Sequence, residues 1–99
     1  MKNDIVLLIA EEIIEDDIGQ QIPIETSREV FCGIRSISRA EWYDAGRSGM
    51  KPSFAVIVDY DDYQGETVAE HSGKRYGIYR TYSADQKEIE LYLEERAGI

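Results

Sequence analysis

Near its C-terminal end the sequence reads Glu88-Ile89-Glu90-Leu91-Tyr92-Leu93-Glu94. Every second residue of this run is a branched aliphatic, and the residues between them are acidic or, at Tyr92, aromatic. A period of two is typical of a β-strand with one face in a core and the other toward solvent. The run therefore predicts a strand in which Ile89, Leu91 and Leu93 face inward, whereas Tyr92 and the glutamates face outward.

The rest of the chain divides into short runs of strand-forming residues separated by turn residues. We expect further strands over residues 5–14, 29–38, 54–60, 66–70 and 75–82. The run 54–60 is apolar on both faces, which predicts a central strand. A hairpin turn is expected over residues 71–74, with Gly73 in the positive-φ position. Residues 15–21 are polar, and we expect a loop there that is long and mobile.

One short helix is expected between the second and third strands. Ser38 and Glu41 have the spacing of a capping box, in which the serine caps the helix and the glutamate reaches back to it. The helix should run from Arg39 to about Ala45 and end at Gly46 or Gly49, with Trp42 and Ala45 facing inward.

These elements together predict a mainly β fold in a single domain over residues 1–99. We expect a small antiparallel β-barrel or sandwich with one short inserted helix, at about residues 39–46, and extended loops.

The charge of the chain limits its binding partners. The formal net charge is −9, and acidic residues outnumber basic ones in both halves of the sequence. Tight binding to a phosphate backbone needs clustered Lys or Arg, so ordinary nucleic-acid binding is not expected. The apolar run at residues 5–10 is too short for a membrane-spanning helix or a usual signal peptide. We therefore expect a soluble, cytosolic protein with no membrane partner.

Residues that could carry chemistry are few. His71 is the single histidine, and we expect it at a hairpin tip, exposed and unpaired. Cys32 is the single cysteine, and its strand pattern predicts a small buried hydrophobe. The acidic run 59–66 fails the calcium-loop pattern because Gly65 comes one residue late, which predicts a solvated turn. Residues 11–17 likewise predict a solvated acidic surface. We expect no enzyme, and no catalytic, cofactor-binding or metal-binding residues.

Nine of the ten aromatic residues lie between Trp42 and Tyr92. Two interpretations stay open for them: packing across strands within the barrel, or a surface for contact between subunits, where Tyr, Trp and Arg are enriched. The candidate contact residues are Trp42, Tyr43, Arg75, Tyr79 and Arg80. Arg80 is expected to pair with a carboxylate, either of a neighbouring subunit or of its own chain.

Three segments of the chain resemble one known family. The first is Glu41-Trp42-Tyr43-Asp44-Ala45-Gly46. The second consists of two runs, Tyr63 to Thr67 and Gly73 to Tyr82. The third is Glu90-Leu91-Tyr92-Leu93-Glu94. In order and spacing these segments resemble the small head-closure proteins (head–tail joining or stopper proteins) of long-tailed bacteriophages. The resemblance covers roughly residues 28–96, and residues 1–27 match less specifically.

The resemblance implies a small β-barrel with an inserted helix that acts as a structural protein of the virion neck. Copies of such a protein form a ring below the portal and its adaptor, retain the packaged double-stranded DNA by non-specific steric contact, and provide the docking surface for the tail-end protein. Such a protein resides in the virion neck, and in the bacterial host cytoplasm during assembly.

An acidic ring would repel the DNA phosphates, so retention must be steric. Two segments are candidates for closing the channel. The preferred candidate DNA-gating loop consists of Gly46, Arg47, Ser48, Gly49, Met50 and Lys51. The second candidate is the loop of residues 16–21.

Two alternatives stay open for the function. One is another virion neck or tail-completion protein. The other is an OB-like oligonucleotide-binding module, which needs a positively charged groove beside its aromatics.

Overall fold

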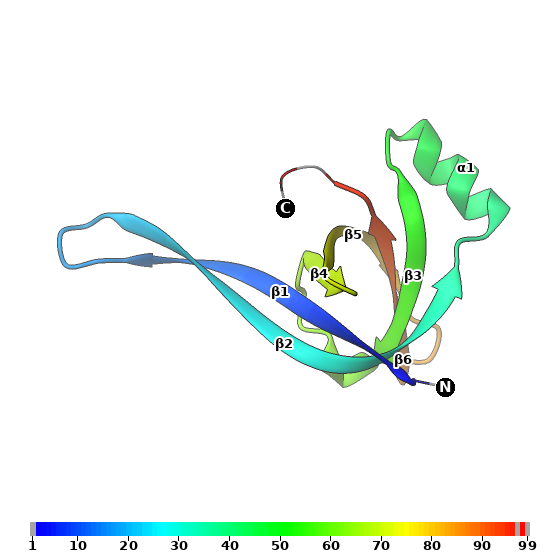
Figure 1. The fold of residues 1–99 in the computed structure, drawn as a ribbon, viewed down its shortest axis with the longest axis horizontal. Coiled ribbons are helices and arrows are strands. Elements are labelled where there is room, and N and C mark those ends of the chain that lie inside the picture. The colour runs from blue at the N-terminus through cyan, green and yellow to red at the C-terminus, as the bar shows by residue number, and fades with distance from the viewer. Residues whose placement is uncertain (1, 97, 99) are drawn as a thin grey trace.

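The computed structural model describes residues 2–96 and 98 and forms a closed six-stranded antiparallel barrel (Figure 1). The helix α1 (Arg39–Arg47) lies between the second and third strands, and a single 3₁₀ turn, η1 (Tyr60–Asp62), follows the third. The strands are β1 (Asp4–Glu15), β2 (Gln21–Ser36), β3 (Pro52–Asp59), β4 (Val68–His71), β5 (Lys74–Tyr82) and β6 (Glu88–Glu94).

The order of strands around the barrel is β1-β2-β3-β6-β5-β4, and β4 closes it by pairing with β1. The predicted β-barrel with one inserted helix is therefore confirmed. Of the two expected forms, barrel and sandwich, the chain adopts the barrel.

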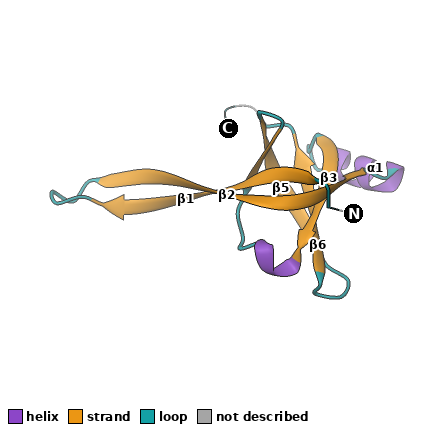
Figure 2. Ribbon diagram, turned by 60° about the horizontal axis from the view of Figure 1, so that its bottom comes forward, coloured by secondary structure: helices purple, strands orange, loops and turns teal. Residues whose placement is uncertain are grey.

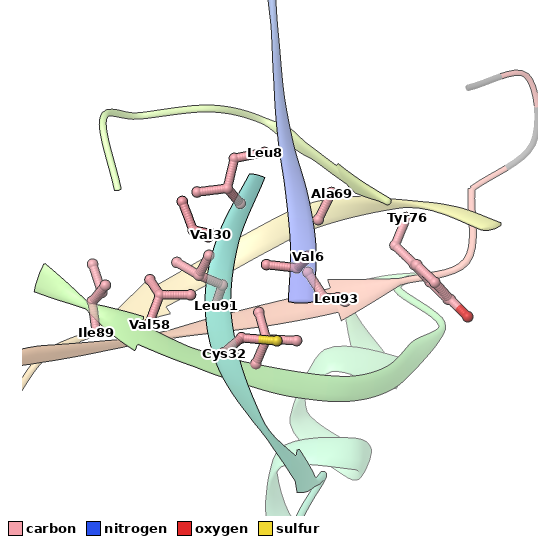
Figure 3. Close-up of a cluster of buried hydrophobic side chains, with 11 residues drawn as sticks. Val6, Leu8, Val30, Cys32, Val58, Ala69, Tyr76, Ile89, Leu91 and Leu93 are labelled. Atoms are coloured by element: carbon pink, nitrogen blue, oxygen red, sulfur yellow. The ribbon is translucent and has the colours of Figure 1, made fainter. Parts of the chain in front are cut away.

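Every strand contributes to the core that fills the barrel: most of its side chains are aliphatic, and β5 contributes the ring of Tyr76 (Figure 3). Ile89, Leu91 and Leu93 face this core, as the alternation in β6 predicts. On the opposite face of β6 the prediction of solvent exposure is wrong for Tyr92 and Glu94, because both side chains are buried. The arginine side chains that cover Tyr92 are described below. β3 pairs with β2 on one side and β6 on the other, as predicted for a central strand, although every strand of this closed barrel has two neighbours.

The β4–β5 hairpin turns through Ser72 and Gly73, whose φ angles are +52° and +79°. Two successive positive φ values are typical of the tight turn that matches the twist of two paired strands. The predicted hairpin and the predicted positive φ of Gly73 are both confirmed.

The largest departure from expectation is in the first hairpin. β2 begins at Gln21 rather than near residue 29, and it pairs with β1 along the whole length from Asp4↔Cys32 to Glu15↔Gln21. Ile9 is the last residue of β1 that also pairs with β4. Residues 10–26, which we call the arm, therefore form a two-stranded ribbon that stands away from the barrel (Figures 1 and 2). The arm makes the molecule 50 Å long against 30 × 26 Å in the other directions.

The tip of the arm, between Glu15 and Gln21, is a compact turn and not the long loop that we expected. The Asp16 carboxylate accepts hydrogen bonds from the backbone amides of Ile18 (3.0 Å) and Gln20 (2.8 Å). The amide of Asp16 also donates to the Gln20 carbonyl at 2.9 Å. An Asp side chain that accepts from the backbone amides after it forms an Asx-type turn, which joins the two strands of the ribbon directly.

No helix in the described part of the chain is long and apolar enough to cross a membrane.

Candidate assembly surfaces

The helix α1 is fixed to the barrel through Glu41. As predicted, the Ser38 hydroxyl caps the helix by accepting a hydrogen bond from the Glu41 amide at 3.1 Å. In a capping box the Glu41 side chain would reach back to the backbone N–H of Ser38, but here it extends to β5 instead. Its carboxylate accepts a hydrogen bond from the Tyr79 hydroxyl at 3.0 Å and forms an ion pair with Arg80. The small side chain of Ala45 is buried, as predicted, where the helix faces the barrel.

This contact extends to β6 and forms a cluster that we call the clamp: Glu41, Tyr79, Arg80 and Tyr92. The Arg80 guanidinium lies 4.1 Å from the centroid of the Tyr92 ring, a distance typical of a cation–π contact. The Tyr92 hydroxyl in turn donates to Glu90 at 2.6 Å and accepts from Arg35 at 2.9 Å. These neighbours cover the outer face of Tyr92, which explains why the ring is buried.

The pKa values of both tyrosines in the clamp are raised, first of all by burial. Burial, and after it the hydrogen bond to the Glu41 carboxylate, raises the pKa of Tyr79 well above its ordinary value. Tyr79 and Arg80 were candidates for contact with another subunit, and Arg80 had two expected partners. In this chain both residues bind Glu41, so the partner of Arg80 is intramolecular.

The two remaining aromatic candidates lie on the outside of α1. Trp42 and Tyr43 are 54% and 60% exposed, and their rings meet edge to face at 5.5 Å between centroids. The expectation that Trp42 faces inward is wrong, because Glu41 and Ala45 occupy the side of the helix toward the barrel. Together with Ile37 and Arg39, these two rings line a shallow depression that we call the helix groove.

Arg75, the last candidate for contact with a subunit, lies at the base of the arm. Its guanidinium donates two hydrogen bonds to the carboxylate of Glu25, at 2.9 and 2.5 Å, and a third to Glu70 at 3.3 Å. The hydrogen bond from Arg75 lowers the pKa of Glu25 below its ordinary value. Because Glu25 belongs to the arm and Glu70 to β4, Arg75 ties the arm to the wall of the barrel.

The predicted DNA-gating segment forms the end of α1 and the turn that follows it. Gly46 and Arg47 are still helical, and the amides of Ser48 and Met50 both donate to the Ala45 carbonyl at 3.0 Å. Gly49 has φ +82°, so of the two predicted helix ends it is Gly49 that reverses the chain. Lys51 then leads into β3. The segment is therefore a hydrogen-bonded turn rather than an extended loop, and its gating role stays a prediction.

His71 does not have the environment that we predicted. Its Nε2 lies 2.9 Å from the Asp4 carboxylate, and its ring packs against Phe54 at 5.5 Å between centroids. The side chain is only partly exposed, so the expectation of an exposed, unpaired histidine is wrong. Cys32 is fully buried, as predicted, and burial raises the pKa of its thiol to about 11. Residues 2–96 and 98 contain no group of three or more His, Cys, Asp or Glu side chains placed to hold a metal ion.

Glu66 was expected in a solvated turn, but it is buried. Its carboxylate accepts two hydrogen bonds from Arg28, at 2.7 and 3.1 Å, and one from the Gln64 amide at 2.8 Å. One sequence signal points to this pair: Arg28 has the same strand phase as Val30 and Cys32, which face the core. A cation at such a position needs a buried partner.

The chain matches no protein-family model, and no curated protein matches its sequence.

Proposed function

We propose that this chain is a head-closure protein of a long-tailed bacteriophage. In this proposal copies of the chain form a ring below the portal and adaptor, keep the packaged DNA inside the head, and provide the surface on which the tail docks.

The clamp is the observation that carries this proposal. Glu41 belongs to the first motif segment, Tyr79 and Arg80 to the second, and Tyr92 to the third. The hydrogen bonds and the cation–π contact of the clamp therefore join segments that are far apart in sequence. Residues that hold a fold together should recur at fixed positions in a family that shares this fold. The resemblance therefore rests on residues that act together.

The exposed apolar surface supports assembly with other subunits. A compact protein of 11.3 kDa exposes about 5,700 Å², whereas this chain exposes 6699 Å². The arm accounts for much of the excess, because both faces of its ribbon lie in solvent. The isoleucines of the arm and, on α1, the rings of Trp42 and Tyr43 are two separate groups of exposed apolar side chains, and exposed apolar patches mark contact sites.

The charge supports a channel through which DNA passes. With −9 on each subunit, a ring would repel phosphates and let a duplex slide without adhering. Retention then needs a steric element, and we keep the segment Gly46 to Lys51 in this role. Because its turn is closed by hydrogen bonds, it would act as a fixed constriction and not as a swinging loop.

Proteins that co-purify with the chain test this proposal against a tail-completion role. A tagged copy is incorporated into phage particles, the particles are dissociated mildly, and the captured proteins are identified by mass spectrometry. A head-closure protein is expected to bring down portal or adaptor on one side and the tail-end protein on the other. Recovery with tail proteins alone would favour tail completion, and recovery of no virion protein would refute both roles.

The oligonucleotide-binding alternative fits the fold less well. An OB-fold is a five-stranded barrel, whereas this barrel has six strands. Titration with a labelled single-stranded oligonucleotide tests it, and nanomolar affinity would revive this alternative.

A further inference from the structure

The arm carries an apolar surface that its own chain leaves uncovered. Five isoleucines on it, between 39% and 80% exposed, are Ile13, Ile14, Ile18, Ile22 and Ile24. Ile14 and Ile22 are direct partners across the two strands, and Ile24 lies on the same face two residues along β2. A two-stranded ribbon without a covering layer is marginally stable in water. A partner that covers this face would stabilise the arm.

The charge of the arm restricts what this partner is. Residues 10–26 contain six acidic side chains and no Lys, Arg or His. The acidic residues are Glu11, Glu12, Glu15, Asp16, Asp17 and Glu25. Two arms would repel each other, and so would an arm and a phosphate backbone or an anionic lipid surface. The complementary partner therefore offers apolar side chains beside positive charge.

The helix groove of a second copy has this combination. It is lined by Ile37, Trp42 and Tyr43 together with the exposed Arg39. Arg39, Tyr43 and Arg47 are four residues apart along α1, so they form one row on the helix surface. Arg47 is 80% exposed and pairs with Asp44 of its own helix. The groove thus presents two aromatic rings beside Arg39, and Arg47 follows Tyr43 on the same row of α1, outside the groove lining.

Two other surfaces fit the arm less well. Ile5 and Phe31 are exposed partners on the outside of β1 and β2, but Glu29 shares their face and would repel an acidic arm. The second surface is a basic depression lined by Lys51, Lys74, Arg75, Glu95 and Arg96. Three of its cations already pair with Glu95, Glu25 and Glu94 of the same chain, whereas Arg39, the cation that lines the helix groove, has no ion-pair partner among residues 2–96 and 98.

We propose that the arm of one copy docks in the helix groove of the next copy. The arm and α1 lie at opposite ends of the molecule (Figure 1). Contact between them is therefore head to tail, which produces a ring when the rotation between copies closes and a filament when it does not. This proposal rests on the ring of the proposed function and names the surfaces that form it.

Pairs of introduced cysteines test the contact without removing any of its side chains. One variant carries Gln20→Cys at the arm tip, and a second carries Ala40→Cys in α1; both positions are exposed. The native Cys32 is fully buried, so unmodified protein is the control for background oxidation. A third variant, Ala84→Cys in the β5–β6 turn, provides an exposed position outside the proposed contact.

Mixtures of two variants are oxidised both as concentrated purified protein and in assembled particles. We expect the mixture of Gln20→Cys and Ala40→Cys to give at least tenfold more cross-linked heterodimer than that of Gln20→Cys and Ala84→Cys. The double variant Gln20→Cys/Ala40→Cys should give a ladder of oligomers. Homodimers of Gln20→Cys as the main product, or equal yields from both mixtures, would overturn the proposal.

Charge reversal tests the electrostatic part. The change Arg39→Glu/Arg47→Glu should reduce the heterodimer yield at least tenfold, and adding Glu12→Lys/Asp17→Lys on the arm should restore it. Circular dichroism checks that each variant is folded. Undiminished cross-linking in the reversed variant would refute the role of these charges. If normal virions do not contain this chain, the proposed function is wrong. The cross-linking yields of the purified protein test the docking contact separately, because they do not depend on that result.

Discussion

Replacement of Glu66 tests how the barrel is held closed beside the arm. The Glu66 side chain is 5% exposed and accepts three hydrogen bonds, two of them from Arg28. Removal of one partner from a buried ion pair costs about 3–5 kcal/mol. The Arg28 side chain is 37% exposed, so water solvates the freed guanidinium in part. We therefore expect Glu66→Ala to lower the free energy of unfolding by about 2–3 kcal/mol.

Urea unfolding followed by far-UV circular dichroism measures this loss. The matched control is Asp44→Ala, which breaks an ion pair whose partners are 80% and 67% exposed. That pair should contribute at most about 0.5 kcal/mol. Glu66→Gln keeps an acceptor for the Gln64 amide and should give an intermediate loss. Equal losses in Glu66→Ala and Asp44→Ala would refute the reasoning.

The same pair predicts a dependence on pH. Burial by itself would raise the pKa of Glu66, but the hydrogen bonds from Arg28 and the Gln64 amide outweigh it, and the pKa is lowered from its ordinary value of 4.5. A carboxylate with a lowered folded-state pKa stabilises the fold above its unfolded-state pKa. Its contribution is lost as the pH falls through the folded-state value. The stability difference between wild type and Glu66→Gln should be full at pH 7 and shrink below about pH 4.5. A constant difference down to pH 3 would contradict this assignment.

Three further changes to the chain and one labelling experiment have distinct expected outcomes. His71→Ala removes a ring packed on Phe54 and should cost about 1–2 kcal/mol in urea unfolding without changing phage assembly or infectivity; lost infectivity at normal stability would indicate a chemical role. Arg75→Ala should cost at most about 1 kcal/mol but speed hydrogen exchange in the arm, and unchanged exchange there would show that Arg75 does not hold it. Cys32 should resist thiol reagents at pH 8 until the protein unfolds, because its pKa is raised to about 11; rapid labelling of folded protein would contradict its burial. Insertion of two glycines after Gly49 lengthens the predicted gating turn and should change DNA retention in complemented particles, whereas unchanged retention argues against that role.

The elements that the sequence predicted well carry a clear local signal. β6 alternates strictly between aliphatic and other residues, β3 is apolar on both faces, and the hairpin at Ser72 and Gly73 has local turn chemistry. The arm was missed because residues 21–28 alternate only weakly and include Pro23. Strand preference depends on the partner strand, and the partner here is the full length of β1.

The side-chain contacts were harder to predict because they join distant residues. Glu41 has the spacing of a capping box, and only the position of β5 sends its carboxylate to Tyr79 and Arg80. The orientation of α1 was also missed. Ala45 is the one residue of this helix that is buried, so the helix has no wide apolar stripe that would reveal which side faces the barrel. The ion pair of Arg28 and Glu66 spans 38 positions of sequence.

Electron microscopy of particles from a phage or lysogen in which this gene is interrupted tests the head-closure role most directly. The proposal predicts tailless heads that have lost their DNA, together with complete unattached tails, and restoration of tailed virions by a plasmid copy of the gene. Intact, DNA-filled, tailed virions in the interrupted strain would contradict it.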